Sequence, residues 1–425
     1  MWWKGFCWLL WGVLFGLLAC GDVGLDTPQP VQDLYSTPDD GNTDASDVPD
    51  VPALPDVEID VVDVVDAGAG DSADVEPSVP DLGPPDSTTD ETSTPSNWGD
   101  VISAIPYQWE WVEFPDTICG DGSPTGLAVN LKPEATRVFI YLEGGGACWD
   151  YSGCAGIVQT SLHLGGYDEG TFEGVIAGTY KNMVVFDREE QKNPLRDAHY
   201  VFIPYCTGDA FSGNAVVELT GLLPWESKTV HFKGRHNIEV YLDRLAPTFA
   251  DVEQVVVSGS SAGGLGAGLS WPLFVEAFPN ATVDVLDDSG PPIQPLDDRW
   301  KDWQDVWNVE LPAECIGCDE SIDNLMDYYR TQLLGEHRLA LMSYDKDAVI
   351  STFLGMFPWQ FRDKLSDVCD VFDTEDNAQY FVLSGVGHTM MILGYTLIES
   401  GDGLPLWRWV EQFVDGESDW SSHSP

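Results

Sequence analysis

The sequence predicts an α/β fold with a mostly parallel central sheet and helices on both faces of that sheet. Two observations lead to this prediction. Apolar, β-branched runs recur after residue 130, and segments with helical spacing of apolar residues lie between several of them. Strands that read as unbroken apolar runs are typical of parallel sheets, which helices bury on both sides. The runs are 138–142, 200–204, 255–258, 282–286, 339–343 and 380–383.

Helical spacing is clearest over residues 236–249, where Ile238, Tyr241, Leu242 and Leu245 fall on one face. Further helices are predicted over 262–278 and 404–413. Ligands of open α/β sheets bind beyond the carboxyl ends of the strands. Residues that directly follow a predicted strand are therefore the first candidates for function.

The first 98 residues differ from the rest of the chain and divide into two predicted segments. Residues 1–20 carry one Lys before an apolar run that is short for a membrane span and typical of a signal peptide. The run ends at Ala19-Cys20, which resembles a bacterial lipoprotein signal with Cys20 as the lipidated residue and sole membrane attachment. Residues 21–98 are predicted to be a disordered linker, and residues 99–425 a single globular domain.

Acidic charge dominates the chain, with a net charge of −52. Residues 21–100 contain 21 Asp and Glu and no Lys or Arg, a composition that favours disorder because like charges repel and few apolar groups can be buried. Such acidity argues against nucleic acid as a partner, since phosphates would be repelled. We expect a monomeric protein that is exported to the bacterial surface or periplasm.

The strongest catalytic motif is Gly259-Ser260-Ser261-Ala262-Gly263, which directly follows the apolar run 255–258. In a G-x-S-x-G turn between a strand and a helix, the flanking glycines let the chain bend sharply and lift the serine hydroxyl above the sheet. The helix that follows favours the negative charge that develops during attack. The motif predicts an α/β-hydrolase-like fold with Ser261 as nucleophile.

Three glycines follow the run 138–142, as Glu143-Gly144-Gly145-Gly146. A glycine-rich loop after an early strand can supply a backbone N–H to an oxyanion hole, and the residue after the nucleophile, Ala262, supplies another. Glycine suits this place because the backbone itself must approach the developing oxyanion.

Together these stretches resemble the pectin acetylesterase and Notum family of carboxylesterases. The matching motifs are Cys119-Gly-Asp-Gly-Ser-Pro, Leu142-Glu-Gly-Gly, Pro204-Tyr-Cys and Gly259-Ser-Ser-Ala-Gly-Gly, in this order. The resemblance implies Ser261 as nucleophile, Gly145, Gly146 and Ala262 as oxyanion donors, and disulfides Cys119–Cys206 and Cys148–Cys154. Notum has Trp after this Leu-Glu-Gly-Gly motif where this chain has Gly146, so the acyl pocket need not be the same.

The base and the acid are expected later in the chain, because this fold has the order Ser, acid, His. His388 follows the last predicted strand among glycines and is the predicted base. Asp345 and Asp347 both follow the run 339–343, and Asp347 best resembles the family's acid position. Asp345 and Asp288 remain alternative acids.

The sequence therefore predicts a serine carboxylesterase that works through an acyl-enzyme, with no metal or cofactor. The resemblance implies an O-acyl ester as substrate, above all an O-acetyl ester of an extracellular polysaccharide. The alternatives are a lipase or polyester depolymerase on the same fold, and a non-catalytic glycan-binding surface lipoprotein. Cys315 could pair with Cys318, or either of them with Cys369.

Overall fold

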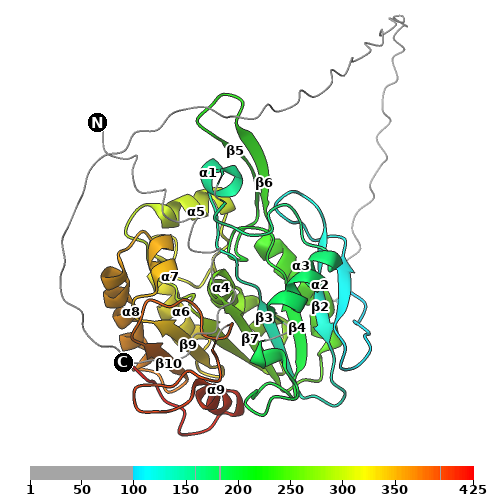
Figure 1. Cartoon of the computed structure of the whole chain (residues 1–425), viewed down its shortest axis with the longest axis vertical. Coiled ribbons are helices and arrows are strands. Elements are labelled where there is room, and N and C mark those ends of the chain that lie inside the picture. Colours follow the sequence, from blue (N-terminus) through cyan, green and yellow to red (C-terminus); the bar gives the residue numbers. More distant parts are fainter. Residues whose placement is uncertain (1–98, 158, 181–182, 393) are drawn as a thin grey trace, which may run out of the picture. The chain divides into compact units, whose positions relative to one another are not determined.

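The computed structural model describes residues 99–425 except 158, 181–182 and 393. The predicted signal segment, Cys20 and the predicted linker up to residue 98 lie outside the described residues. The described part contains an eight-stranded sheet in the order β1-β2-β4-β3-β7-β8-β9-β10 (Figure 1). The predicted α/β fold with a mostly parallel sheet is confirmed.

The six strands that the sequence predicts form the parallel part of the sheet, and each pairs in parallel with its neighbours there. They are β3 (Arg137–Leu142), β4 (His199–Ile203), β7 (Gln254–Ser260), β8 (Thr282–Asp288), β9 (Leu339–Tyr344) and β10 (Ala378–Leu383).

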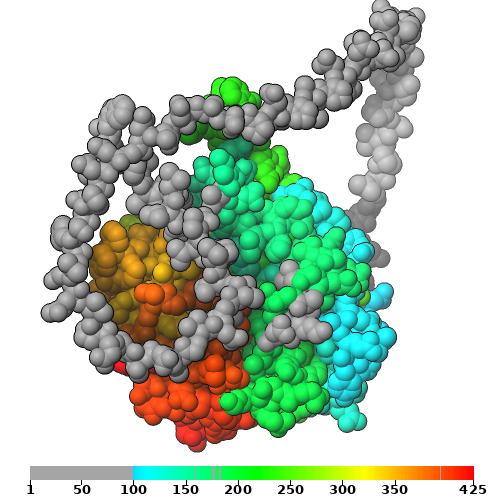
Figure 2. Space-filling view, in the orientation of Figure 1, coloured from blue at the N-terminus to red at the C-terminus, as the bar shows by residue number. Residues whose placement is uncertain are grey.

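Two antiparallel features escaped the sequence analysis. Strands β1 (Glu110–Phe114) and β2 (Thr125–Asn130) extend the sheet beyond β4 with antiparallel pairing. Strands β5 (Ala215–Thr220) and β6 (Ser227–Phe232) form a separate hairpin that projects from the body of the domain (Figure 1). In Figure 2 the cyan residues of the β1–β2 edge lie on the side opposite the orange and red C-terminal residues, as the strand order requires.

Alternate residues of the strands enter two separate apolar cores, one on each face of the sheet. Val255 and Val257 of β7 pack in the first core with Trp271 and Phe274, whereas Val256 packs in the second. The first core also receives α3 (Gly234–Thr248), α4 (Ala262–Ala277), α5 (Arg299–Trp307), α6 (Leu325–Gln332) and α8 (Pro358–Phe372). The second receives α2 (Glu169–Gly178) and α9 (Leu406–Asp415).

Strands β7 and β8 continue two residues past the predicted apolar runs, to Ser260 and Asp288. These polar residues are fully buried yet remain in the ladder because their side chains bond to each other, with Ser260 Oγ donating to Asp288 Oδ2 at 2.7 Å. Near the C-terminus, Pro405 precedes α9 and delays its start to Leu406, since proline suits a helix start but not its interior.

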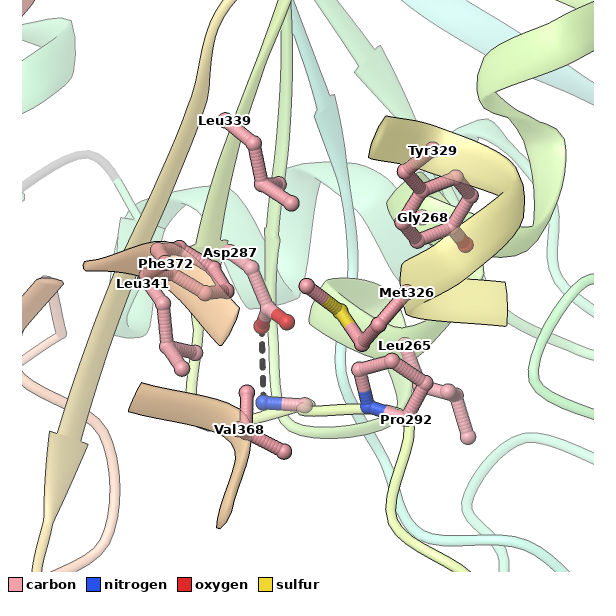
Figure 3. A pocket seen from close by; sticks show the side chains of 11 residues that line it. Leu265, Gly268, Asp287, Pro292, Met326, Tyr329, Leu339, Leu341, Val368 and Phe372 are labelled. Carbon is pink, nitrogen blue, oxygen red and sulfur yellow. Dashed lines mark hydrogen bonds between the residues drawn. The ribbon is translucent and has the colours of Figure 1, made fainter. Parts of the chain in front are cut away.

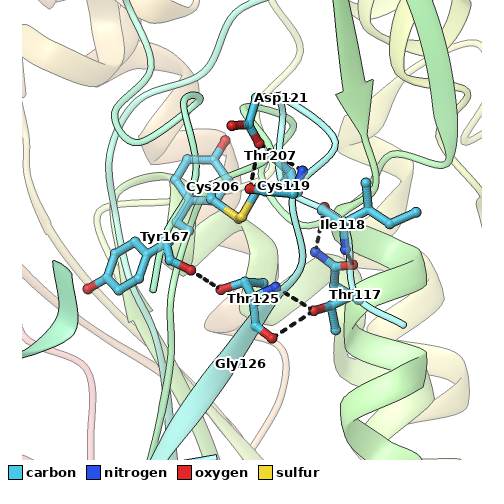
Figure 4. The surroundings of a disulfide bond; sticks show 12 residues. Thr117, Ile118, Cys119, Asp121, Thr125, Gly126, Tyr167, Cys206 and Thr207 are labelled. Atoms are coloured by element: carbon cyan, nitrogen blue, oxygen red, sulfur yellow. Dashed lines mark hydrogen bonds between the residues drawn. A yellow bond between two sulfur atoms is a disulfide. The ribbon is translucent and has the colours of Figure 1, made fainter. Parts of the chain in front are cut away.

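Disulfides tie the loops at the carboxyl ends of the strands. Cys119, in the β1–β2 connection, is bonded to Cys206 after β4, next to buried Thr117 and Thr125 (Figure 4). Cys148 is bonded to Cys154 at the short helix α1 (Tyr151–Ala155). Of the three pairings left open by the sequence, the structure has the one that joins Cys315 to Cys318, and it leaves Cys369 without a disulfide partner among the described residues. No helix in the described part is long and apolar enough to cross a bilayer.

Candidate active site

Ser261 occupies the sharp turn between β7 and α4, with φ of 61° and ψ of −121°. This region of backbone space is unfavourable for a residue with a side chain, and such strain is characteristic of nucleophile turns. The glycines at both flanks are required, because a Cβ at Gly259 would collide with Gly263 and Leu142 O, and a Cβ at Gly263 would collide with Leu142 O. The backbone N–H of Ser261 donates to Asp288 O at 2.7 Å, which ties the turn to β8.

The glycine-rich loop lies directly against this turn. A Cβ on Gly144 would collide with Ser260 O and touch Ser261 Cβ, so the loop could not approach with a larger residue. Gly146 has a φ of 74° and also faces a neighbouring carbonyl, Thr160 O. Within the described residues, the N–H groups of Gly145, Gly146 and Ala262 donate no hydrogen bond. Free donors beside a serine hydroxyl can stabilise an oxyanion.

His388 and Asp347 meet after β10 and β9, 41 positions apart in the chain. His388 Nδ1 lies 2.8 Å from Asp347 Oδ2, with the imidazole side chain 20% exposed and the carboxylate fully buried. The other oxygen of Asp347 accepts from Val349 N (2.9 Å) and Ile350 N (3.0 Å) and so caps the short helix α7 (Ala348–Phe353). Capping fixes the carboxylate in place, and its second oxygen bonds the imidazole at Nδ1, so that Nε2 has no hydrogen-bond partner among the described residues.

The structure gives the two alternative acids other partners. Asp345 accepts from Gly385 N at 2.8 Å and pairs with Lys346 at 2.8 Å. Asp288 accepts from Ser260 Oγ, Met390 N and Met391 N, at 2.7, 2.7 and 3.0 Å. Asp347 is therefore the one of the three predicted carboxylates that bonds the His388 ring.

Ser261 and His388 both lie at the carboxyl ends of the parallel strands, after β7 and β10. No hydrogen bond joins their side chains among the described residues. Both flank the end of β8, since Asp288 bonds Ser261 through its carbonyl and Met390 through its carboxylate. Catalytic hydrogen bonds are often long in the unliganded state and shorten only with substrate bound.

An apolar pocket opens beside Ser261. Apart from Ser261, every lining residue is glycine or apolar. The far wall is aromatic, with Trp303 of α5 stacked on Phe353 of α7 at 4.7 Å between ring centroids. The lining comprises Gly146, Ala210, Ala262, Leu265, Gly290, Pro291, Ile293, Trp303, Ile322, Val349, Ile350, Phe353 and Leu354.

Burial raises the pKa of two carboxyl groups behind the site. Desolvation raises the pKa of Glu143, beside the glycine loop, to about 8. It likewise raises the pKa of Asp287 to about 8, and that carboxyl accepts from Gly290 N at 2.7 Å within a second, apolar cavity that includes Tyr329 and Phe372 (Figure 3). No cluster of His, Cys, Asp or Glu that could hold a metal ion is found within the described residues.

Comparison with known proteins supports the predicted resemblance. Residues 111–303 match the family model described as Pectinacetylesterase. Residues 111–303 are pectin acetylesterase/Notum-like. Palmitoleoyl-protein carboxylesterase NOTUM of Schmidtea mediterranea is 30% identical over 180 residues, which are 40% of this chain and 31% of that protein. For the NOTUM protein of Homo sapiens, the identity is 28%, over 40% of this chain and 34% of the relative.

Pectin acetylesterase 5 of Arabidopsis thaliana is 28% identical over 40% of this chain and 38% of its own length. The chain thus spans about a third of the length of the curated relatives it matches. The family match includes the glycine loop and Ser261 but ends at residue 303, before Asp347 and His388. The pairing of those two residues rests on the structure's own geometry.

Sequence reasoning missed two parts of this site. One is the apolar pocket, whose wall comes from α5 and α7, elements that the sequence analysis did not predict. The other is the set of contacts made by Asp288, which the sequence suggested only as an alternative acid. The run Asp287-Asp288-Ser289-Gly290 at a strand end was a signal for a polar role, but the sequence could not say which groups it would bond.

Proposed function

We propose that this chain is a serine carboxylesterase that hydrolyses O-acyl esters through an acyl-enzyme. Ser261 attacks the ester carbonyl, and His388 accepts the serine proton and returns it to the leaving alcohol. Asp347 holds the His388 tautomer, and the N–H groups of Gly145, Gly146 and Ala262 stabilise the oxyanion. The observation that carries the proposal is the contact of 2.8 Å between Asp347 and His388. It lies at the carboxyl ends of the parallel strands, where the strained turn of Ser261 also lies and packs against the glycine-rich loop.

The related carboxylesterases support this activity class, and the plant relative's name supports an acetylated polysaccharide as substrate. A fluorophosphonate probe tests the mechanism, because it labels only an activated serine. We expect labelling of the wild type and none of Ser261→Ala, with p-nitrophenyl acetate hydrolysis lost in the same variant. Hydrolysis that survives Ser261→Ala in a folded protein would overturn the proposal and would favour another nucleophile. A folded wild type that is neither labelled nor active would overturn it in favour of a non-catalytic binding protein.

The apolar pocket favours a second candidate substrate, an ester with a longer acyl chain. The lining is apolar apart from Ser261, so an aliphatic acyl chain would gain from burial against Trp303 and Phe353. A series of p-nitrophenyl esters from acetate to dodecanoate separates the two candidates by the acyl length at which kcat/KM is greatest.

A pocket-filling variant sharpens this test. Val349 lines the pocket and is partly exposed, so Val349→Phe narrows the pocket without overfilling the core. If longer chains bind here, Val349→Phe lowers kcat/KM for them and leaves acetate hydrolysis close to wild type. Thr352→Phe, at an exposed position of the same helix outside the lining, is the matched control. An equal effect of both variants, or none on any ester, would exclude the pocket as the acyl site.

We further propose export and anchoring by a lipid at Cys20. The three disulfides of the described part support an oxidising compartment, since cytosolic thiols are kept reduced. Metabolic labelling with radioactive palmitate tests the anchor, and Cys20→Ser should abolish both the label and membrane sedimentation. Label that persists in Cys20→Ser would contradict the proposal.

A further inference from the structure

The end of β8 carries a buried polar segment that bonds to both halves of the proposed catalytic machinery. Asp288 and Ser289 are both fully buried. The carboxylate of Asp288 accepts from Met390 N at 2.7 Å and Met391 N at 3.0 Å, and Ser289 Oγ accepts from Thr389 N at 3.2 Å. Three consecutive backbone N–H groups directly after His388 are thus bound by two neighbouring side chains.

The same segment holds the serine turn. Asp288 O accepts from Ser261 N at 2.7 Å, and Asp288 Oδ2 accepts from Ser260 Oγ at 2.7 Å. Ser260 in turn accepts from the hydroxyl of Tyr141 on β3, at 2.9 Å. One residue of β8 therefore joins the backbone of the nucleophile, the side chain before it and the loop that follows the base.

The loop that follows His388 depends on the contacts made by Asp288 and Ser289. This loop leaves β10 at Leu383, and its tip bends back with Thr389 at a φ of 62°. Met390 and Met391 are buried, so their N–H groups have no access to water and depend on the carboxylate. Without Asp288 these N–H groups would be unpaired, and the loop would have to move to satisfy them.

We propose that Asp288 is a positioning residue that fixes the His388 loop against the Ser261 turn, so that the imidazole is aligned for proton transfer. This inference rests on the proposed serine esterase function. Asp288 makes no hydrogen bond to the His388 ring, because its carboxylate oxygens accept from Ser260, Met390 and Met391 while Asp347 bonds the ring. Its effect on the rate should therefore pass through His388.

A double-mutant comparison tests that dependence. Asp288→Asn keeps the size of the side chain but places an NH₂ group against a backbone or serine donor. We expect its kcat on p-nitrophenyl acetate to fall by about 10- to 100-fold with KM changed far less, since small displacements of a catalytic group can cost about this much. In a His388→Ala background the same substitution should cost no more than about twofold, because residues acting as one unit are not additive.

Asp284→Asn is the matched control. Asp284 lies in the same strand, is equally buried, and pairs with Arg338 at the opposite end of β8. Its loss should lower the unfolding temperature without lowering kcat of the folded enzyme. If Asp288→Asn does not fold, Ser289→Ala removes only the Thr389 contact and should give a smaller loss of kcat that again disappears in the His388→Ala background.

The outcomes separate this inference from the proposed function. A folded Asp288→Asn enzyme with wild-type kcat would overturn the positioning role alone, as would an equal fractional loss in the wild-type and His388→Ala backgrounds. A wild type without esterase activity, or a His388→Ala variant as active as the wild type, would instead overturn the proposed function.

Discussion

Replacing Asp347 by Asn separates the two interactions of this carboxylate, the cap of α7 and the contact with the imidazole. Its Oδ1 caps α7 through Val349 N and Ile350 N, and its Oδ2 bonds His388 Nδ1. Asn can keep the cap, because its carbonyl oxygen accepts hydrogen bonds as well as a carboxylate does at a helix start. Its NH₂ group, however, then faces Nδ1 and favours the tautomer in which Nε2 carries the proton, so that His388 cannot accept one from Ser261.

The expected magnitude follows from these contacts. A triad acid changed to its amide typically lowers kcat by about 10⁴-fold, which corresponds to about 5.5 kcal/mol of transition-state stabilisation. Stability should change by less than about 1 kcal/mol, because the helix cap survives. Asp347→Ala should add the loss of the cap, about 1 kcal/mol, to a similar catalytic defect.

Three measurements on purified protein check this expectation. They are kcat and KM on p-nitrophenyl acetate, the rate of fluorophosphonate labelling, and the free energy of unfolding in urea. Asp345→Asn is the control, since Asp345 follows the same strand but bonds Lys346 and Gly385 instead of the imidazole. Its kcat should stay within about tenfold of wild type, as expected for a residue outside the reacting groups.

An Asp347→Asn enzyme that keeps kcat within tenfold of wild type would refute the assignment of the acid. A larger kcat loss in Asp345→Asn than in Asp347→Asn would move the acid to Asp345. A parallel fall of kcat and stability in Asp347→Asn would instead mean that the residue serves the fold and not the imidazole.

Three further predictions concern the scaffold of the site. Replacing Cys119 and Cys206 by Ser removes a disulfide that joins residues 87 positions apart and should lower the free energy of unfolding by about 4 kcal/mol. Unfolding in urea measures this loss, and wild-type protein under reducing conditions is the control. Gly146→Ala forces a Cβ toward Thr160 O at positive φ and should lower kcat more than KM; unchanged kcat would exclude this loop from the oxyanion hole. Glu143, with its pKa raised from 4.5 to about 8, favours the folded state fully only below pH 4.5, so wild-type stability should fall as pH rises from 4.5 through 8. Glu143→Gln should flatten this decline in a series of melting temperatures, and an identical decline in both proteins would contradict the shift.

The sequence predicted those parts of the molecule whose cause is local. Strands such as β7 are apolar throughout because both faces of a parallel sheet are buried, and Ser261 stands out because a strained turn needs glycine on both sides. The antiparallel strand β1 was missed because its residues are only partly buried and follow no apolar run. The hairpin of β5 and β6 was missed for the same reason.

The sequence pattern could not identify the acid among the three candidates, since Asp288, Asp345 and Asp347 all follow a predicted apolar run. Their difference arises from partners far along the chain, because the loop after β10 decides which carboxylate meets His388 and which meets the backbone beyond it. A pattern of residue types within one segment contains no such information. The chain order that the fold imposes narrows the acid to residues between Ser261 and His388 and goes no further.

The different roles that we propose for Asp347 and Asp288 follow from the hydrogen bonds that each role requires. The acid has to share one oxygen with the imidazole, so its other oxygen needs donors that are already fixed, and the start of α7 supplies them to Asp347. A carboxylate that holds a loop needs both oxygens for donors other than the imidazole. At the end of a central strand, those of Asp288 accept from Met390 N, Met391 N and Ser260 Oγ. Burial raises the pKa of Asp288, and its hydrogen-bond donors oppose that rise. Because the two carboxylates approach the His388 loop from neighbouring strands, exchanging their roles would require the loop to turn over, and we therefore expect no single substitution at Asp347 to recruit Asp288 as the acid.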